Sequence, residues 1–167
     1  MKVSTRRERE RLRESFRPPH IQLLFIGESP PASGRFFYSA NSGLYRAMRM
    51  AFQLAGPTVD DKNFLAMFQA RGCYLTDLCL EPVDHLGPDE RRALRREGEK
   101  HLARQLKRLR PVMIGPVLRS IIGNVENAVS LAHWNGQIVR FPYPGRWSRH
   151  REAFIKALVP IIQRLNE

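Results

Sequence analysis

The sequence has few cysteines and no long apolar run, and both absences narrow its possible functions. Cys73 and Cys79 are the only cysteines among 167 residues, too few for a zinc or iron–sulfur site of four thiolates. No stretch is apolar over the length of a membrane span, and the charged amino terminus lacks the apolar segment of a signal peptide. We therefore expect a cytoplasmic protein with no membrane partner, and we interpret the cysteines as buried free thiols.

Acidic residues are scarce relative to basic ones. The chain has 28 Lys and Arg residues against 16 Asp and Glu, a formal net charge of +12. Arginine predominates and pairs well with phosphate, so this balance favours a polyanionic partner, above all nucleic acid, over a merely solvated basic surface. Hydrophobic residues make up 43% of the chain, which is enough for a buried core and is untypical of a disordered protein.

The length suits a single domain. Residues 1–19 are rich in charge and end at Pro18 and Pro19, which predicts a basic N-terminal arm or helix. No internal repeat, low-complexity segment or linker interrupts the remainder. We expect residues 20–167 to form one α/β domain.

Short apolar runs alternate along the chain with segments of helical periodicity. The expected strands are residues 21–26, 73–80, 111–115 and 137–143. The expected helices are residues 41–55, 63–71, 89–110 and 148–165, with a shorter one around 118–122. Continuously apolar strands that alternate with helices predict a three-layer α/β/α fold around a four-stranded, mainly parallel sheet. Ligands of such folds bind at the carboxyl ends of the strands.

The segment after the first expected strand, residues 27–38 (GESPPASGRFFY), is the strongest functional indication. Glu28 follows a glycine and precedes two prolines, so its carboxylate has little freedom. Three consecutive aromatic residues come shortly afterwards. Aromatic rings can stack on an extruded base while a carboxylate acts at the sugar. The segment therefore indicates chemistry on a nucleobase.

Residues 27–31 (GESPP) resemble the first motif of the uracil-DNA glycosylase superfamily, in which a glycine, an acidic or amide residue, a variable residue and a proline follow the first strand. Weaker similarities follow in the family's order. Residues 74–77 (YLTD) resemble the strand that carries the base-reading residue, residues 110–115 (RPVMIG) resemble the third strand, and residues 136–147 occupy the position of the second motif. One branch of the family has Gly-Glu-Ala-Pro-Gly in the first motif, but it normally carries an iron–sulfur cluster, for which this chain lacks the cysteines.

The resemblance extends over roughly residues 21–165 and implies a role for each matching residue. Glu28 would activate or position the attacking water. The base would be bound by Ser29, Pro30, Phe36, Phe37, Tyr38 and Asp77, with Phe37 or else Phe36 stacking on it. DNA would be bound by Arg35, Pro144, Gly145, Arg146, Trp147 and Arg149, and the loop at 144–147 would enter the duplex. No metal or cofactor is expected.

The chain departs from the family pattern at two positions. Phe141 stands where the family often has a histidine that donates a hydrogen bond to the leaving base, and phenylalanine cannot donate one. Asp77 replaces the usual asparagine. An ionised aspartate only accepts hydrogen bonds and favours a base edge that offers a donor, whereas burial could raise its pKa and restore a donor. Uracil, a deaminated or damaged purine and a modified cytosine therefore all stay open as substrates.

These observations predict a monofunctional DNA glycosylase that hydrolyses the N-glycosidic bond of a flipped-out base and leaves an abasic site. No lysine occupies a matching motif position, so we expect hydrolysis rather than a Schiff-base lyase reaction. Double- and single-stranded DNA are both open as partners, as are roles in repair and in defence, and we expect a monomer. The alternatives are a non-catalytic nucleic-acid-binding module on the same fold and an enzyme acting on free nucleosides or nucleotides.

Overall fold

The computed structural model describes residues 5–56, 58–144 and 148–165. A four-stranded sheet occupies its centre, with the strands in the order β2-β1-β3-β4 and every neighbouring pair parallel. The strands are β1 (Leu23–Gly27), β2 (Cys73–Asp77), β3 (Met113–Pro116) and β4 (Gln137–Ile138). The helices are α1 (Arg6–Ser15), α2 (Gly43–Ala55), α3 (Phe64–Ala70), α4 (Pro88–Leu109), α5 (Ile122–Ala132) and α6 (Ser148–Arg164), with 3-10 turns η1 (Phe37–Ser39) and η2 (Arg119–Ile121). The predicted α/β fold class with a four-stranded sheet is confirmed.

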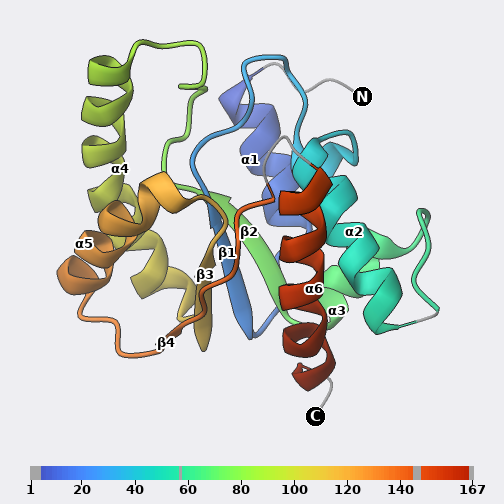
Figure 1. Cartoon of the computed structure of the whole chain (residues 1–167). Helices are drawn as coiled ribbons and strands as arrows, with labels where there is room; N and C mark the ends of the chain where they lie inside the picture. Colours follow the sequence, from blue (N-terminus) through green and yellow to red (C-terminus); the bar gives the residue numbers. More distant parts are fainter. Residues whose placement is uncertain (1–4, 57, 145–147, 166–167) are drawn as a thin grey trace.

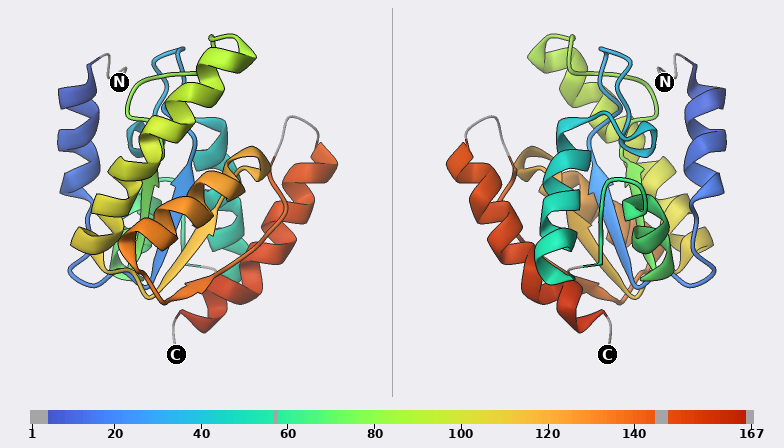
Figure 2. Two further views of the ribbon diagram at one scale, coloured as in Figure 1. Left: turned by 90° about the vertical axis from the view of Figure 1, so that its left-hand side faces the viewer. Right: turned by 90° about the vertical axis from the view of Figure 1, so that its right-hand side faces the viewer.

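Helices cover both faces of the sheet. Helices α4 and α5 pack together on one face, and α2, α3 and α6 cover the other (Figure 1; Figure 2). Helix α1 lies on the β2 side of the sheet, where Arg13 contacts Asp77 (Figure 2). Every residue of β1 and β2 is buried, as parallel strands covered on both faces require. The continuous apolar runs of the sequence thus mark two fully buried strands.

An aromatic cluster fills the layer between the sheet and helices α2 and α3. The ring of Phe25 on β1 stacks on Phe68 at 5.9 Å between centroids, and Phe68 also contacts Phe52 and Phe64. All four side chains are fully buried. Aromatic pairs of this kind bury large areas and fix the distance between layers.

The charged N-terminal segment forms a helix that is docked rather than extended into solvent. Thr5 and Glu8 form a capping box at its start, with hydrogen bonds of 3.2 and 3.0 Å. Arg9 and Arg13 are buried, with exposed fractions of 5% and 3%. Arg9 donates to the carbonyl oxygen of Leu80 at 3.0 Å. The basic residues of this segment are therefore partly internal and partly exposed.

Three elements differ from the sequence prediction. Strand β4 has two residues instead of the predicted seven, and beyond it the N–H of Val139 still donates to the carbonyl oxygen of Ile114 at 2.8 Å. Strand β2 ends at Asp77 rather than at residue 80, so Cys79 lies beyond the strand and does not share a strand face with Cys73. Both cysteines are nevertheless free and buried, as predicted. Helix α5, for which only residues around 118–122 were predicted, continues to Ala132.

No helix in the described part of the chain is long and apolar enough to span a bilayer.

Candidate functional site

A cleft opens at the carboxyl ends of β1, β2 and β3, where parallel α/β folds bind their ligands. Its volume is about 590 Å³, which is within the range of small-molecule sites. Loops that follow the strands form one side of it, and α2, α4 and α6 contribute the other. The apolar part of its lining comes from Phe36, Phe37, Leu44, Leu75, Val117 and Leu118. The cleft thus has an apolar part as well as the polar groups described below.

Glu28 lines the cleft directly after β1 and is 8% exposed. Arg91 donates to both of its carboxylate oxygens, with Nε at 2.9 Å from Oε2, and Arg95 donates to Oε2 as well. The two arginines are one turn apart on α4 and therefore share a face. Burial raises the pKa of Glu28, but the hydrogen bonds and charges of Arg91 and Arg95 outweigh it, and the net pKa is below the ordinary value. The carboxylate is ionised at neutral pH.

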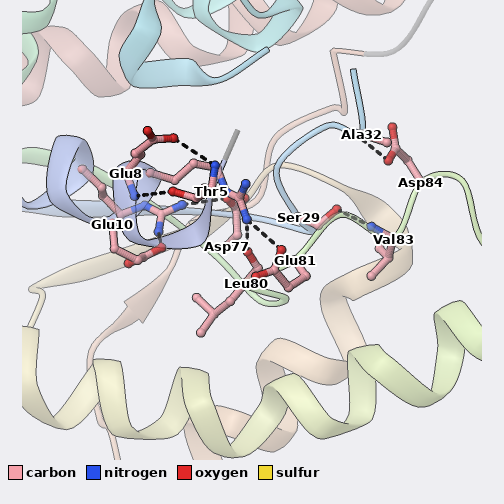
Figure 3. Close-up of polar contacts among 12 residues, drawn as sticks. Thr5, Glu8, Glu10, Ser29, Ala32, Asp77, Leu80, Glu81, Val83 and Asp84 are labelled. Carbon is pink, nitrogen blue, oxygen red and sulfur yellow. Dashed lines mark hydrogen bonds and ion pairs between the residues drawn. The ribbon is translucent and has the colours of Figure 1, made fainter. Parts of the chain in front are cut away.

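Two hydrogen bonds tie the loop that carries Glu28 to the loop after β2. The hydroxyl of Ser29 accepts from the backbone N–H of Val83 at 3.3 Å, and the carboxylate of Asp84 accepts from the N–H of Ala32 at 3.0 Å (Figure 3). Ser29 and Asp84 both line the cleft. These bonds hold the two loops against each other and restrict the backbone that follows Glu28.

The three predicted aromatic residues do not share one environment. Phe36 and Phe37 line the cleft, with 1% and 3% of their surface exposed. A base could stack on either ring only after neighbouring side chains shift. Tyr38 lies in the core, where its hydroxyl donates to the carbonyl of Leu75 at 3.2 Å and accepts from the N–H of Leu75 at 2.7 Å. The structure therefore brings two of the three rings to the cleft. Pro30 is also buried in its lining.

Asp77 ends β2 opposite Gly27 and also lines the cleft. Its Oδ2 accepts from Arg13 at 2.8 Å. A Cβ at position 27 would lie 2.6 Å from Asp77 Oδ1, so a larger residue there would displace this carboxylate. Burial raises the pKa of Asp77 to about 6 although Arg13 attracts the charged form. Ionised Asp77 therefore predominates at neutral pH.

Further arginines border the cleft. Arg46 of α2 and Arg151 of α6 line it, are exposed, and form no ion pair with a described residue. Of the predicted DNA-binding residues, Arg35 and Arg149 are exposed. Exposed guanidinium groups without carboxylate partners are suited to bind phosphate.

The region that corresponds to the second motif divides into two parts. Phe141 packs into the core against Phe25 and Phe154, with ring centroids at 5.8 and 5.4 Å, and it does not line the cleft. Tyr143 and Pro144 do line it. The predicted roles of Gly145, Arg146 and Trp147 fall outside the described residues and stay predictions.

No family model and no curated protein matches this chain. The similarity to the uracil-DNA glycosylases therefore rests on the motif residues alone.

The sequence interpretation missed the arginines that pair with the two carboxylates. A pattern for Arg91 and Arg95 does exist, because they continue the buried stripe of α4 formed by Gly98 and Leu102 at steps of three and four residues. Arginines at core-facing positions predict buried carboxylate partners. Arg13 gives no such indication, since the buried residues of α1 are Arg9 and Arg13 themselves and it has no buried apolar stripe to continue.

Within the described ranges, no three side chains of His, Cys, Asp and Glu come together as a metal site would require.

Proposed function

We propose that the protein is a DNA glycosylase that hydrolyses the N-glycosidic bond of an extruded base and leaves an abasic site. The observation that carries this proposal is the carboxylate of Glu28, which is ionised and fixed in the wall of a cleft of about 590 Å³. An ionised carboxylate in such a position is suited to stabilise a positively charged sugar.

The charge around the cleft supports a DNA substrate. Arg46 and Arg151 line it and have no carboxylate partner among the described residues, and the whole chain has a net charge of +12. These guanidinium groups would bind phosphates on either side of the extruded nucleotide. The base would enter the apolar part of the cleft, beside Phe36 and Phe37.

The reaction follows from the state of Glu28. As the bond between C1′ and the base nitrogen breaks, its electron pair leaves with the base and C1′ becomes cationic. The carboxylate stabilises that cation and orients a water, whose oxygen forms the new bond to C1′ and whose proton passes to the solvent or to the departed base. Because Arg91 and Arg95 lower the pKa of Glu28, it is a weak base and acts chiefly through its charge and its position.

A second function is supported by the same ion pairs. Both oxygens of Glu28 already accept hydrogen bonds from arginines, and a carboxylate so satisfied also suits a purely structural role. In that case the protein is a nucleic-acid-binding module without catalysis.

A cleavage panel distinguishes the two functions. Wild type and Glu28→Gln are incubated with duplex and single-stranded oligonucleotides that each contain one test base, and hot alkali reveals abasic sites. The matched control is Glu126→Gln on α5, which removes an exposed carboxylate that pairs with Arg140. We expect cleavage by wild type and by the control, and a rate for Glu28→Gln lower by about a hundredfold or more.

Thermal unfolding and DNA affinity of each variant are measured in parallel. A folded Glu28→Gln protein that binds DNA but does not cleave it supports the glycosylase. Salt-sensitive binding by wild type without cleavage of any test base supports the binding module and contradicts the proposed reaction.

A further inference from the structure

One oxygen of a buried carboxylate in the cleft has no hydrogen-bond partner among the described residues. Asp77 is 5% exposed, and its Oδ2 accepts from Arg13, but no described donor reaches its Oδ1. That oxygen lies beside Gly27 of the cleft lining, where the missing side chain leaves it uncovered. Oδ1 is not among the fully buried side-chain atoms that lack a partner in the described part of the chain, so this acceptor is accessible from the cleft that Asp77 lines. Oδ1 is therefore the one atom of this side chain that is free to bind a ligand.

Helix α1 determines how this carboxylate is presented. Arg13 is 3% exposed, pairs with Glu10 as well as Asp77, and lies over the ring of Phe36 at 5.3 Å. Figure 3 shows Asp77 between Glu10 of α1 and the loop that follows β2. Arg13 thus engages Oδ2 from the side away from Gly27 and favours the ionised form of the carboxylate. The other charges that act on Asp77 are those of Glu10, Arg9 and Glu28.

We propose that Oδ1 of Asp77 accepts a hydrogen bond from the exocyclic amine of the bound base, and that Arg13 is the positioning residue that keeps Asp77 a pure acceptor. The ligand class is a nucleobase with an amine on its pairing edge, such as a cytosine-type or adenine-type base. This inference rests on the proposed function only in taking a base as the ligand of the cleft.

The chemistry of the base edges explains the selectivity. The amine of cytosine or adenine has two N–H donors and presents one of them to Oδ1. Uracil and hypoxanthine carry a carbonyl oxygen at the same ring position, and that oxygen is repelled by an ionised carboxylate. The N–H of uracil is flanked by carbonyl oxygens on both sides, so it approaches Oδ1 only together with a repelled neighbour. An asparagine in place of Asp77 would donate to that carbonyl instead.

The test compares matched pairs of ligands that differ only in amine against carbonyl. Calorimetric titration measures the binding of the 5′-monophosphates of deoxycytidine and deoxyuridine, and of deoxyadenosine and deoxyinosine. We expect wild type to bind the amine member of each pair at least about tenfold more tightly. Asp77→Asn should lose or reverse that preference.

The role of Arg13 is tested with a matched pair of variants. Arg13→Met should reduce the preference, because Asp77 then loses the partner that holds Oδ2. Arg17→Met removes an arginine just after α1 that pairs with Glu14 and does not act on Asp77, and this variant should keep the preference. Equal binding of both members by wild type, no binding of any of them, or an unchanged preference in Asp77→Asn would each overturn the inference. The wild-type comparison decides even if a variant does not fold.

Excision assays with the same four bases in oligonucleotides separate this inference from the proposed reaction. A binding preference for amines without excision of any base supports the inference and contradicts the glycosylase. Excision of uracil alone, abolished in Glu28→Gln, supports the glycosylase and overturns the inference.

Discussion

Replacing Gly98 by alanine tests how α4 is seated on the sheet. An alanine Cβ at this position would lie 2.3 Å from the carbonyl oxygen of Leu78 and 3.0 Å from its carbonyl carbon. Both atoms are backbone and cannot turn away, so α4 must move outward by roughly 1 Å in a tightly packed interior. Overpacking of this kind costs about 1–3 kcal/mol, whereas alanine in place of glycine stabilises a helix interior by about 1 kcal/mol.

The clash outweighs the helix propensity, and we expect a net loss of about 1 kcal/mol and a Tm lower by about 2–4 °C. The site should respond as well, because the same helix carries Arg91 and Arg95 to Glu28. DNA cleavage should therefore fall by more than the loss of folded protein accounts for. Thermal unfolding and the cleavage assay, with the fraction of folded protein measured by circular dichroism, give both quantities.

The control is Gly123→Ala on α5, where an added Cβ meets no atom within 4 Å. This variant should be as stable as wild type or more stable, by up to about 1 kcal/mol, with cleavage unchanged. A Gly98→Ala protein that is more stable than wild type would refute the close contact between α4 and the end of β2.

Three further predictions concern charge and reactivity. The preference for amine-bearing bases should fall as the pH is lowered from 7 to 5, because Asp77 becomes protonated near its pKa of about 6 and no longer offers an ionised acceptor. A preference that stays constant in binding titrations across this range would contradict this prediction. Because the pKa of Glu28 is lowered in the folded protein, its ionised carboxylate stabilises the fold fully above the unfolded-state pKa of about 4.3, and this stabilisation is lost as the pH falls through the folded-state pKa. The free energy of unfolding, measured by circular dichroism, should therefore decrease in wild type as the pH falls below about 4.3, and it should decrease less steeply in Glu28→Gln. Arg46→Gln and Arg151→Gln should each reduce the slope of log affinity for duplex DNA against log salt by about 0.9, and slopes equal to that of wild type would show that these arginines do not contact phosphate.

The sequence predicted the fold well where the chain is continuously apolar. Strands β1, β2 and β3 are buried on both faces, and their runs of apolar residues are distinct from helical stripes. Prediction failed where burial is one-sided or side chains are small. Helix α5 buries Val125, Ala128 and Ala132, which form a weak stripe, and neither residue of β4 is fully buried.

The site shows the same division between local and long-range information. The position of Glu28 at the end of a buried strand could be predicted because glycine and proline residues define that turn. Its partners Arg91 and Arg95 lie 63 and 67 residues away, and no local pattern pairs them with one particular carboxylate. The contact between Arg13 and Asp77 depends on how α1 packs, which the sequence of α1 alone does not determine.

The order of the strands has a consequence for the synthesis of the chain. Strand β1 is central, and Leu23 pairs with Cys73 on one side and with Met113 on the other. A ribosome-bound chain that ends before residue 113 therefore has one edge of β1 open, with its backbone groups unpaired. Long-range parallel pairing of this kind forms slowly. Nascent chains that contain β1 and β2 but not β3 should be the form most prone to aggregation and most dependent on chaperones.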